Sequence, residues 1–284
     1  MTESAKLTTF TATGTVEQRA ALPLRRVLAD IGLLTQRNLR RILLNPRLLV
    51  FTTIQPLLQL IMFTIVFGAV ATAAGDIPYK DFVVPAVLVQ TMTFAAMSSG
   101  VGIARDLEGG MIERFRSLPI ARSAFLLGRT VSDSTRLTIQ ALLLLVAALI
   151  IGFRFHSNVF GALAMIVSVV LFGIALTAFS AWVGLSVRDP EVVQAAIFLP
   201  LLPLVFTSSA FAPIDRLPGW MQPVANINPI TSAIDTARGF ALGSDRLYAV
   251  SGHGLGHSLL RFALWWIGIV VVFTWLAVRR YRRG

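Results

Sequence analysis

Cysteine is absent from this sequence, and lysine occurs only twice, as Lys6 and Lys80. Without cysteine the chain forms no disulfide, no thiolate metal site and no cysteine nucleophile. A phosphate-binding loop needs a lysine directly after a glycine-rich turn, and neither lysine has that setting. The sequence therefore excludes this route to nucleotide hydrolysis within the chain.

Charge of either sign is also scarce. Charged residues make up 14% of the 284 positions, against roughly 25% in soluble domains, whereas 55% are hydrophobic and the mean hydropathy is +0.74. This composition is typical of a polytopic membrane protein. The net charge of +11 is carried by arginines that flank apolar runs. Anionic lipid headgroups are therefore the expected partner, and no nucleic acid is expected.

Six apolar runs are long enough to cross a bilayer as helices, which takes about 20 residues each. They cover residues 48–70, 83–104, 137–153, 160–186, 192–212 and 262–278. Pro200 and Pro203 are expected to kink the fifth run, and Pro56 interrupts the first run more mildly. The predicted fold is an all-α polytopic membrane protein with six transmembrane helices.

The distribution of lysine and arginine predicts the orientation of these helices. With the N-terminus inside, 19 of the 25 basic residues lie in inside segments and 6 in outside segments. An excess of this kind is typical of short cytoplasmic loops. Both termini are therefore expected in the cytoplasm.

The polar N-terminal stretch divides into two parts. Residues 1–23 are rich in Thr and Ala, and we expect them to be disordered in the cytoplasm. Residues 24–46 predict a basic amphipathic helix on the membrane surface, with Leu24 and Ile31 on one face and Arg37 on the other. An ordinary helix packed on soluble protein is the alternative. Residues 47–284 then form the six-span domain.

Residues 105–136 form a charged loop between the second and third runs, with six arginines and four acidic residues. Within it, Met111, Ile112 and Phe115 share one face of a short predicted helix that Pro119 ends. A short helix with an apolar face, tied to two spans, suits docking into a groove of a soluble partner. The alternative is a solvated connector that only carries the positive-inside signal.

The long outside segment, residues 213–261, alternates proline breaks with apolar patches too short to span a bilayer. These patches predict re-entrant or interfacial helices that close the outer mouth. The alternative is an exposed, structureless loop, which we disfavour because Trp220, Met221 and Phe240 would need covering.

The titratable residues of the outside segment form no obvious catalytic or metal-binding set. Asp215, Asp235 and Asp245 are scattered along it, and each is expected to cap a helix or to be solvated. His253 and His257 have a spacing that binds metal on a helix, but glycines interleave them and disfavour a stable helix. We therefore predict no metal site.

Inside the predicted spans, polarity is carried by uncharged side chains. All 14 Asp and Glu residues lie outside the runs, which argues against a proton- or ion-coupled carrier, because such carriers hold charged residues in the membrane. Five side chains are candidates for lining a transport path, with hydrogen bonding between helices as the alternative. They are Gln55, Gln59, Gln90, Thr91 and Gln140.

Two motifs and the order of the elements resemble the membrane subunit of type-2 ABC exporters, in particular the daunorubicin-resistance-like branch of bacterial drug and lipid exporters. The first motif lies in the inside loop and comprises Glu113, Leu118, Pro119, Arg122, Arg129 and Asp133. The second lies in the outside segment and comprises Leu217, Pro218, Trp220, Asn228, Pro229, Arg238 and Gly243. The resemblance covers residues 25–280.

The resemblance implies a permease of the bacterial plasma membrane that is not an enzyme and holds no cofactor of its own. ATP and magnesium would be bound by a separate ATP-binding cassette protein, and a second copy or a related permease would complete the path. Coupling to the ATPase would fall on the helix in the inside loop and on its flanks. These residues are Glu108, Met111, Ile112, Glu113, Phe115, Arg116, Leu118, Pro119 and Arg122.

The cargo and the class of protein leave alternatives. A hydrophobic drug-like molecule is the first expectation, by resemblance to the drug-resistance branch, and a lipid or lipid-linked glycan is the second. A self-sufficient carrier or channel is a different class, disfavoured by the missing intramembrane charge. A membrane enzyme is disfavoured because no nucleophile, base and metal ligands cluster in the sequence.

Overall fold

The computed structural model describes residues 46–68, 77–109 and 122–283. Within these ranges every regular element is a helix. The predicted disordered stretch 1–23, most of the predicted interfacial helix 24–46 and the predicted loop helix around Met111 and Phe115 lie outside the described residues.

Four of the helices are long and apolar enough to cross a membrane: Tyr79–Glu108, Thr130–Ile151, Val159–Val187 and Leu255–Arg280. Two further apolar stretches, Thr53–Val66 and Pro190–Phe206, are shorter. The all-helical fold and the polytopic membrane character predicted from composition are thereby confirmed.

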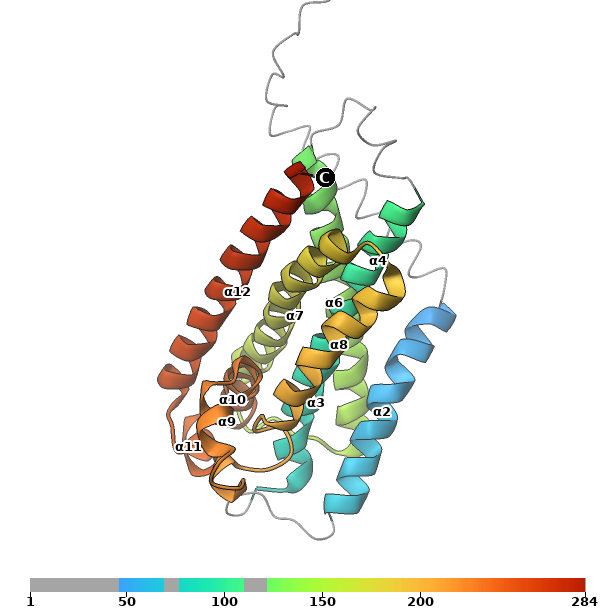
Figure 1. The fold of residues 1–284 in the computed structure, drawn as a ribbon. Helices are drawn as coiled ribbons and strands as arrows, with labels where there is room; N and C mark the ends of the chain where they lie inside the picture. Colours follow the sequence, from blue (N-terminus) through green and yellow to red (C-terminus); the bar gives the residue numbers. More distant parts are fainter. Residues whose placement is uncertain (1–45, 69–76, 110–121, 284) are drawn as a thin grey trace, which may run out of the picture.

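In the described part of the chain, the long helices run side by side as rods between two ends of the molecule (Figure 1). They are α2 (Pro46–Gly68), α3 (Tyr79–Ala95) continued by α4 (Met97–Glu108), α6 (Arg122–Ile151), α7 (Val159–Val187), α8 (Pro190–Phe206) and α12 (Leu255–Arg283). The start of α2 and the ends of α4 and α12 lie at one end, together with the turn from α7 to α8 (Figure 1). The outside segment, residues 213–261, lies at the other end (Figure 1). The connections predicted on the basic side and those predicted on the other side therefore lie at opposite ends of the bundle.

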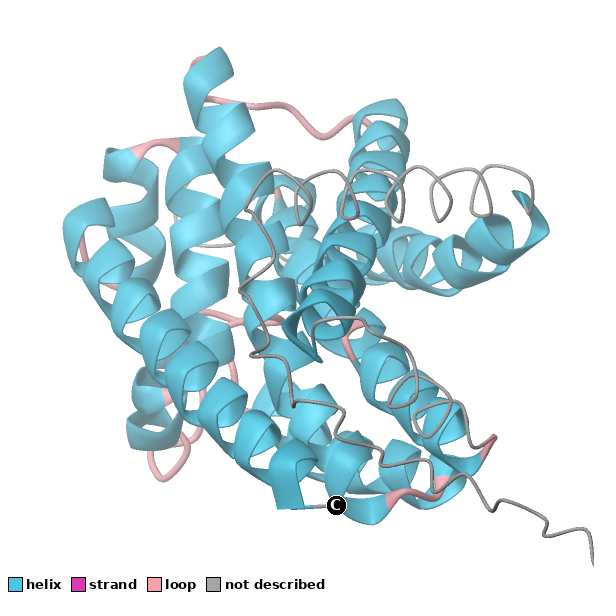
Figure 2. Cartoon of the chain, turned by 90° about the horizontal axis from the view of Figure 1, so that it is seen from above, coloured by secondary structure: helices cyan, strands magenta, loops and turns pink. Residues whose placement is uncertain are grey.

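Seen from above, the helices pack side by side (Figure 2). Among the described helices, α7 packs against α3, α4, α6, α8, α10 and α12. It approaches α4 most closely where two glycines face each other. A Cβ atom on Gly100 would collide with the Ser180 carbonyl, and one on Gly184 would collide with the Gly100 carbonyl. Glycine at both positions therefore allows the two backbones to touch, as small residues do in membrane helix pairs.

The third rod begins at Arg122 and runs from the charged loop into the predicted span 137–153. Two predicted boundaries are corrected by the structure. The sixth rod begins at Leu255, before the predicted start at 262. The fifth rod ends at Phe206 rather than 212. There the Thr207 and Ser208 hydroxyls donate to the carbonyls of Pro203 and Val205, and side chains of this kind compete with the helical backbone pattern.

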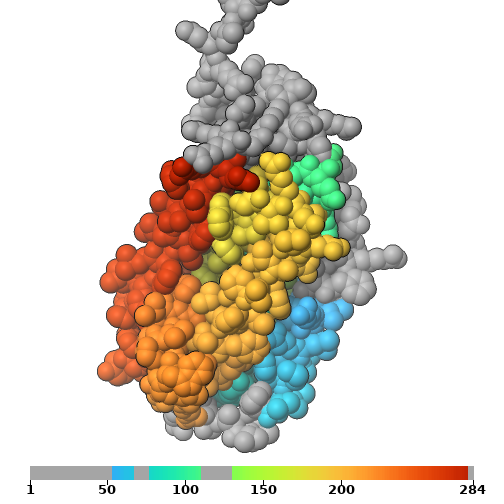
Figure 3. Space-filling view, in the orientation of Figure 1, coloured from blue at the N-terminus to red at the C-terminus, as the bar shows by residue number. Residues whose placement is uncertain are grey.

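The outside segment folds into four short helices: η1 (Ile214–Arg216), α9 (Gln222–Ile227), α10 (Pro229–Leu242) and α11 (Ser244–Ser251). Almost the whole of α10 is buried, against α3, α7 and α12. The segment covers the ends of α8 and α12 as a continuous mass (Figure 3). Short helices are as the sequence predicts, and the alternative of a structureless loop is wrong.

Candidate functional site

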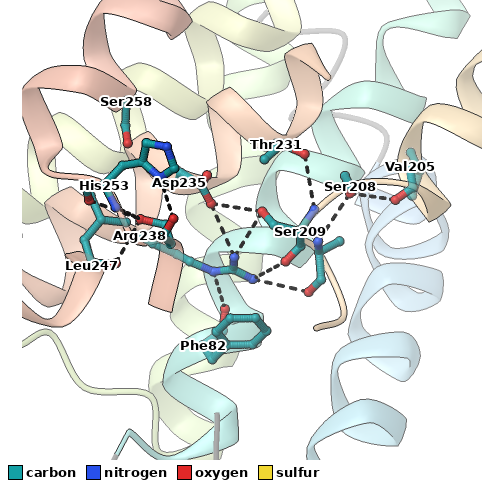
Figure 4. Close-up of polar contacts among 12 residues, drawn as sticks. Phe82, Val205, Ser208, Ser209, Thr231, Asp235, Arg238, Leu247, His253 and Ser258 are labelled. Carbon is teal, nitrogen blue, oxygen red and sulfur yellow. Dashed lines mark hydrogen bonds and ion pairs between the residues drawn. The ribbon is translucent and has the colours of Figure 1, made fainter. Parts of the chain in front are cut away.

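The most buried charged side chain in the described residues is Arg238, on α10, which is 0% exposed. Its Nε donates to the Phe82 carbonyl of α3 at 3.0 Å, and its Nη2 donates to the Ser209 carbonyl at 2.8 Å and the Ala210 carbonyl at 3.3 Å. The guanidinium carbon lies 3.6 Å from the centroid of the Phe82 ring. Figure 4 shows this side chain reaching from α10 between two other elements.

Asp235, one helical turn before Arg238, supplies the opposite charge. Its Oδ1 lies 3.6 Å from Arg238 Nη1 and accepts a hydrogen bond from the Ser209 hydroxyl at 2.9 Å. Burial lowers the pKa of the Arg238 guanidinium to about 10 although Asp235 opposes the shift, so the group is charged at neutral pH. A buried charge is tolerated when it is paired and fully hydrogen-bonded. Arg238 therefore fastens α10 to α3 and to the chain that leaves α8.

Asn228, at the start of α10, links this helix to the end of α8. Its Oδ1 accepts from the Ile230 amide at 2.8 Å, which is the hydrogen bond of a helix N-cap. Its Nδ2 donates to the Leu204 carbonyl at 2.6 Å and to the Thr207 hydroxyl at 3.3 Å. The last carbonyls of a helix have no partner within the helix. Asn228 thus starts α10 and terminates α8 with one side chain, while Pro229 takes the first helical position.

The other residues predicted at the outer mouth do not join this cluster. The Leu217 carbonyl accepts from Gln222 Nε2 at 3.0 Å in the turn before α9. Pro218 is exposed and the Trp220 side chain is 74% exposed. The prediction that Trp220 needs covering is wrong within this chain, because the indole lies on the outside of the short helices.

The prediction for Asp235 as a capping or solvated carboxylate is also wrong. Asp235 is 4% exposed and paired with Arg238. Sequence reasoning missed the pair because both residues were assigned to a loop outside the membrane. The signal that would have found it is the separation of three positions between opposite charges in an otherwise apolar helical patch.

Charges also lie deeper in the helix bundle than the sequence boundaries predict. The apolar stretch Thr130–Ile151 includes Asp133 and Arg136. Asp81 on α3 is 2% exposed, accepts from the Arg154 amide at 3.2 Å and lies 3.7 Å from His156 Nε2. Asp81 and Asp133 thus lie within helical rods, in the parts that precede the predicted spans 83–104 and 137–153.

Two of the five candidate path residues bond to each other between helices. Gln59 on α2 donates through Nε2 to Gln90 Oε1 on α3 at 2.9 Å. Thr91 is buried and donates to the Val87 carbonyl of its own helix at 2.6 Å, and Gln140 on α6 is buried. Gln55 is exposed on α2. The Gln59–Gln90 contact is the interhelical bonding that was the alternative for these residues.

The predicted coupling residues lie mainly outside the described part of the chain. Glu108 ends α4 and is exposed, and Arg122 is the first residue of α6. The residues between them, Met111, Ile112, Glu113, Phe115, Arg116, Leu118 and Pro119, fall in the range that the structure does not describe. The two ends of the loop lie at the same end of the bundle (Figure 1).

The histidines of the outside segment form a stacked pair. The rings of His253 and His257 have centroids 4.7 Å apart and planes at 30°. Among the described residues no group of three or more histidine, aspartate or glutamate side chains is placed to hold a metal ion. This pair by itself offers two ligands at most, fewer than the three or four protein ligands of a zinc site.

The fold defines a class: a bundle of long apolar helices with short helices at one end, of which α10 is buried. The chain belongs to the ABC-2 type transporter family, whose model matches residues 29–242. It is a permease subunit of an ABC exporter, a transport component whose ATPase activity lies in separate subunits. The resemblance read from the two motifs is thereby confirmed.

Relatives at the level of individual proteins point to one branch of this family. The chain is 30% identical over 237 residues to the daunorubicin resistance ABC transporter permease protein DrrB1 of Streptomyces coeruleorubidus, which covers 84% of this chain and 80% of the relative. It is 26% identical over 260 residues to the probable doxorubicin resistance permease DrrC of Mycobacterium tuberculosis, covering 92% and 91%. A probable multidrug permease of Escherichia coli, YbhR, is 23% identical over 165 residues, which is 57% of this chain and 44% of the relative.

Proposed function

We propose that this permease forms half of the translocation path of an ATP-driven exporter for hydrophobic, drug-like molecules. The observation that carries the proposal is the similarity over most of the chain to permeases named for daunorubicin and doxorubicin resistance. A separate ATP-binding cassette protein supplies the energy and holds ATP and magnesium. A second copy of the chain, or a related permease, completes the path.

The proposed topology has six membrane crossings, with both termini on the cytoplasmic side of a bacterial plasma membrane. The faces of α2, α6, α7, α8 and α12 support it, because they expose large apolar side chains that water would penalise. Ile150, Phe160 and Leu199, for example, are 80%, 80% and 74% exposed. The proposal places 24–46 on the inner surface, Met111–Arg122 against the ATPase, and α10 as a re-entrant helix at the outer mouth.

Aromatic rings beside α8 favour a flat, apolar cargo. Phe94 of α3 and Phe198 of α8 have ring centroids 5.8 Å apart. Nearer the outside segment, the Phe211 ring lies 5.6 Å from Phe206 and 5.1 Å from Phe63 of α2. Phe198 and Phe206 are 43% and 58% exposed. Aromatic faces of this kind stack on planar rings, which a fused-ring drug offers and a glycan does not.

The experiment begins with pull-down of the tagged chain from its native membranes, to obtain the ATP-binding cassette protein bound to it. The two proteins are reconstituted together in liposomes, and uptake of daunorubicin is followed with and without ATP. Uptake that requires ATP, and that stops when the phosphate-loop lysine of the ATPase is replaced, supports the proposal. The same vesicles without the ATPase are the matched control.

Other outcomes identify the alternatives. Uptake by the permease without the ATPase, driven by a gradient or passive, would replace the proposal with a self-sufficient carrier or channel. ATP-dependent movement of a lipid-linked glycan, with none of daunorubicin, would keep the exporter and change its cargo.

A further inference from the structure

The second helical rod changes its hydrogen-bond pattern near its middle, while Ala96 keeps helical backbone angles. The α3 helix ends at Ala95 and α4 begins at Met97, with Ala96 between them. At this point the Ser99 amide donates to the Ala96 carbonyl, three residues back, at 3.1 Å. A regular α-helix bonds four residues back, and a local tightening inside a helix often marks a hinge. The regular pattern would pair the Ser99 amide with the Ala95 carbonyl.

The Ala95 carbonyl is bonded by side chains from two helices. The Ser98 hydroxyl donates to it at 2.7 Å from α4, and Arg136 Nη2 donates to it at 2.9 Å from α6. A charged donor gives this hydrogen bond more strength than a neutral one. The guanidinium of α6 thus meets the carbonyl at the point where the second rod changes its pattern.

A second contact joins the same two helices on the other side of the break. Asp133 Oδ2 accepts from the Ser99 hydroxyl at 2.6 Å, and Asp133 Oδ1 lies 3.9 Å from Arg136 Nη2. The Asp133 and Arg136 side chains are only 16% and 23% exposed. We call Ser99, Asp133 and Arg136, with the Ala95 carbonyl, the α4–α6 clasp. It holds α6 to the last residue of α3 and to the first turn of α4.

The α4 helix and the first part of α6 form a helical hairpin. The clasp joins these two helices at the end of the hairpin that lies away from Glu108 and Arg122. The 12 residues of α4 extend about 18 Å from the break to Glu108, at about 1.5 Å per residue. Asp133 lies a similar distance from Arg122 at the start of α6, about 17 Å by the same rise. Both arms lead to the loop between Glu108 and Arg122. Any force on that loop is thus applied to two arms that are joined again at the clasp.

The packing of α4 on α7 places a pivot at the same level. Gly100, the residue after Ser99, touches the backbone of α7 at Ser180 and Gly184. Backbones in direct contact leave no side chain to yield between them. This backbone contact between α4 and α7 therefore offers a fixed point at the level of the clasp.

We propose that Asp133 and Arg136 are positioning residues that make α4 and α6 move as one lever, so that ATP-driven force on the loop bends the second rod at Ala95–Ala96. The inference rests on the proposed function and adds the residues that transmit the force. Their loss separates ATP hydrolysis from transport rather than abolishing hydrolysis.

The test uses the reconstituted permease–ATPase complex and measures ATP hydrolysed and cargo transported in the same vesicles. Asp133→Asn, Arg136→Gln and Ser99→Ala are compared with Ser134→Ala, whose hydroxyl bonds only to the Thr130 carbonyl of its own helix among the contacts recorded for it. We expect about a tenfold rise in ATP hydrolysed per cargo molecule, with hydrolysis itself changed less than about twofold, because each change removes a hydrogen bond to a charged group of the clasp. Ser134→Ala should leave the ratio unchanged.

A rescue experiment separates force transmission from mere folding. The chain has no cysteine, so Ser99→Cys with Asp133→Cys gives one unique thiol pair. We expect the double variant to transport poorly and a short bifunctional thiol reagent to restore transport, because the covalent link replaces the lost hydrogen bond. Each single cysteine variant, treated with the same reagent, is the control and should not recover.

Three results would overturn the inference. They are a normal ATP-to-cargo ratio in Asp133→Asn and Arg136→Gln, a parallel loss of hydrolysis and transport, and loss of the remaining transport when the thiol pair is linked. The last would mean that α4 and α6 must part during the cycle. Failure of the proposed function has a different signature, because the unaltered complex would then show no ATP-dependent transport at all.

Discussion

Arg238 of α10 and Phe82 of α3 are 156 positions apart in the sequence and meet twice, through a 3.0 Å hydrogen bond from Nε to the Phe82 carbonyl and through the guanidinium 3.6 Å above the phenyl ring. The outer helices are therefore part of the packed bundle. Their position depends on one buried cation that serves three carbonyls and one carboxylate.

Arg238→Met should destabilise the protein strongly. It leaves Asp235 buried without its partner, and breaking a buried ion pair on one side costs about 3–5 kcal/mol. Denaturant unfolding of the purified variant in detergent measures the loss. Arg238→Met combined with Asp235→Leu should be more stable than Arg238→Met alone, since no uncompensated charge remains. A double variant less stable than the single one would contradict this role for the pair.

Asn228 should show graded effects, because its amide has two separate functions. Asn228→Ser keeps a neutral side-chain acceptor that can cap α10 but loses the amide donor to the Leu204 carbonyl. Asn228→Ala loses both. We expect the alanine variant to lose about 1 kcal/mol more of unfolding free energy than the serine variant, the typical value of an N-cap. Equal losses in the two variants would assign the whole effect to the contact with α8.

Gly100→Ala and Gly184→Ala should each impair folding, because the added methyl collides with backbone atoms of the facing helix. Overpacking of this kind typically costs about 1–3 kcal/mol. Gly268→Ala on α12 is the matched control: its Cβ meets nothing within 4 Å, and alanine favours a helix over glycine by about 1 kcal/mol. The yield of folded permease in detergent, by size-exclusion chromatography, checks the contrast. Comparable yields from all three variants would refute the close approach of α4 and α7.

Phe206→Ala should weaken recognition of cargo more than it affects folding. The Phe206 ring is 58% exposed and stacks on Phe211, and an aromatic pair contributes about 0.5–1.5 kcal/mol beyond burial. We expect the cargo concentration for half-maximal transport to rise by about three- to tenfold, with a smaller change in maximal rate. Leu264→Ala on α12, where the leucine is 63% exposed, is the control for a lost apolar surface group. An equal shift in both variants would remove α8 from the path.

The membrane class, the helical fold and the family were accessible from the sequence because their signals are local. A helix that meets lipid needs an unbroken apolar run of fixed length, and the run is visible without any tertiary contact. The connections between helices that are rich in arginine and those that are poor in it likewise predict which helix ends lie together. In Figure 1 the two kinds of connection lie at opposite ends of the bundle. The motif residues Asn228, Pro229 and Arg238 are singled out only by their resemblance to a family pattern, and the sequence does not show their roles.

Those roles depend on tertiary contacts. Asn228 contacts the Leu204 carbonyl because α8 ends at Phe206, and Arg238 is satisfied by carbonyls of Phe82, Ser209 and Ala210. Every residue has a backbone carbonyl, so the sequence of side chains does not predict which carbonyls will accept a hydrogen bond from Arg238 or Asn228. Asp235 and Asp133 were assigned to water for the same reason: the cost of burying a charge is offset by partners distant in sequence. The sequence by itself determined that the chain crosses a membrane and which ends of its helices lie together, since lipid acts on each helix separately. Only the tertiary structure decided which polar groups are buried and what they hold, since that depends on the geometry between helices.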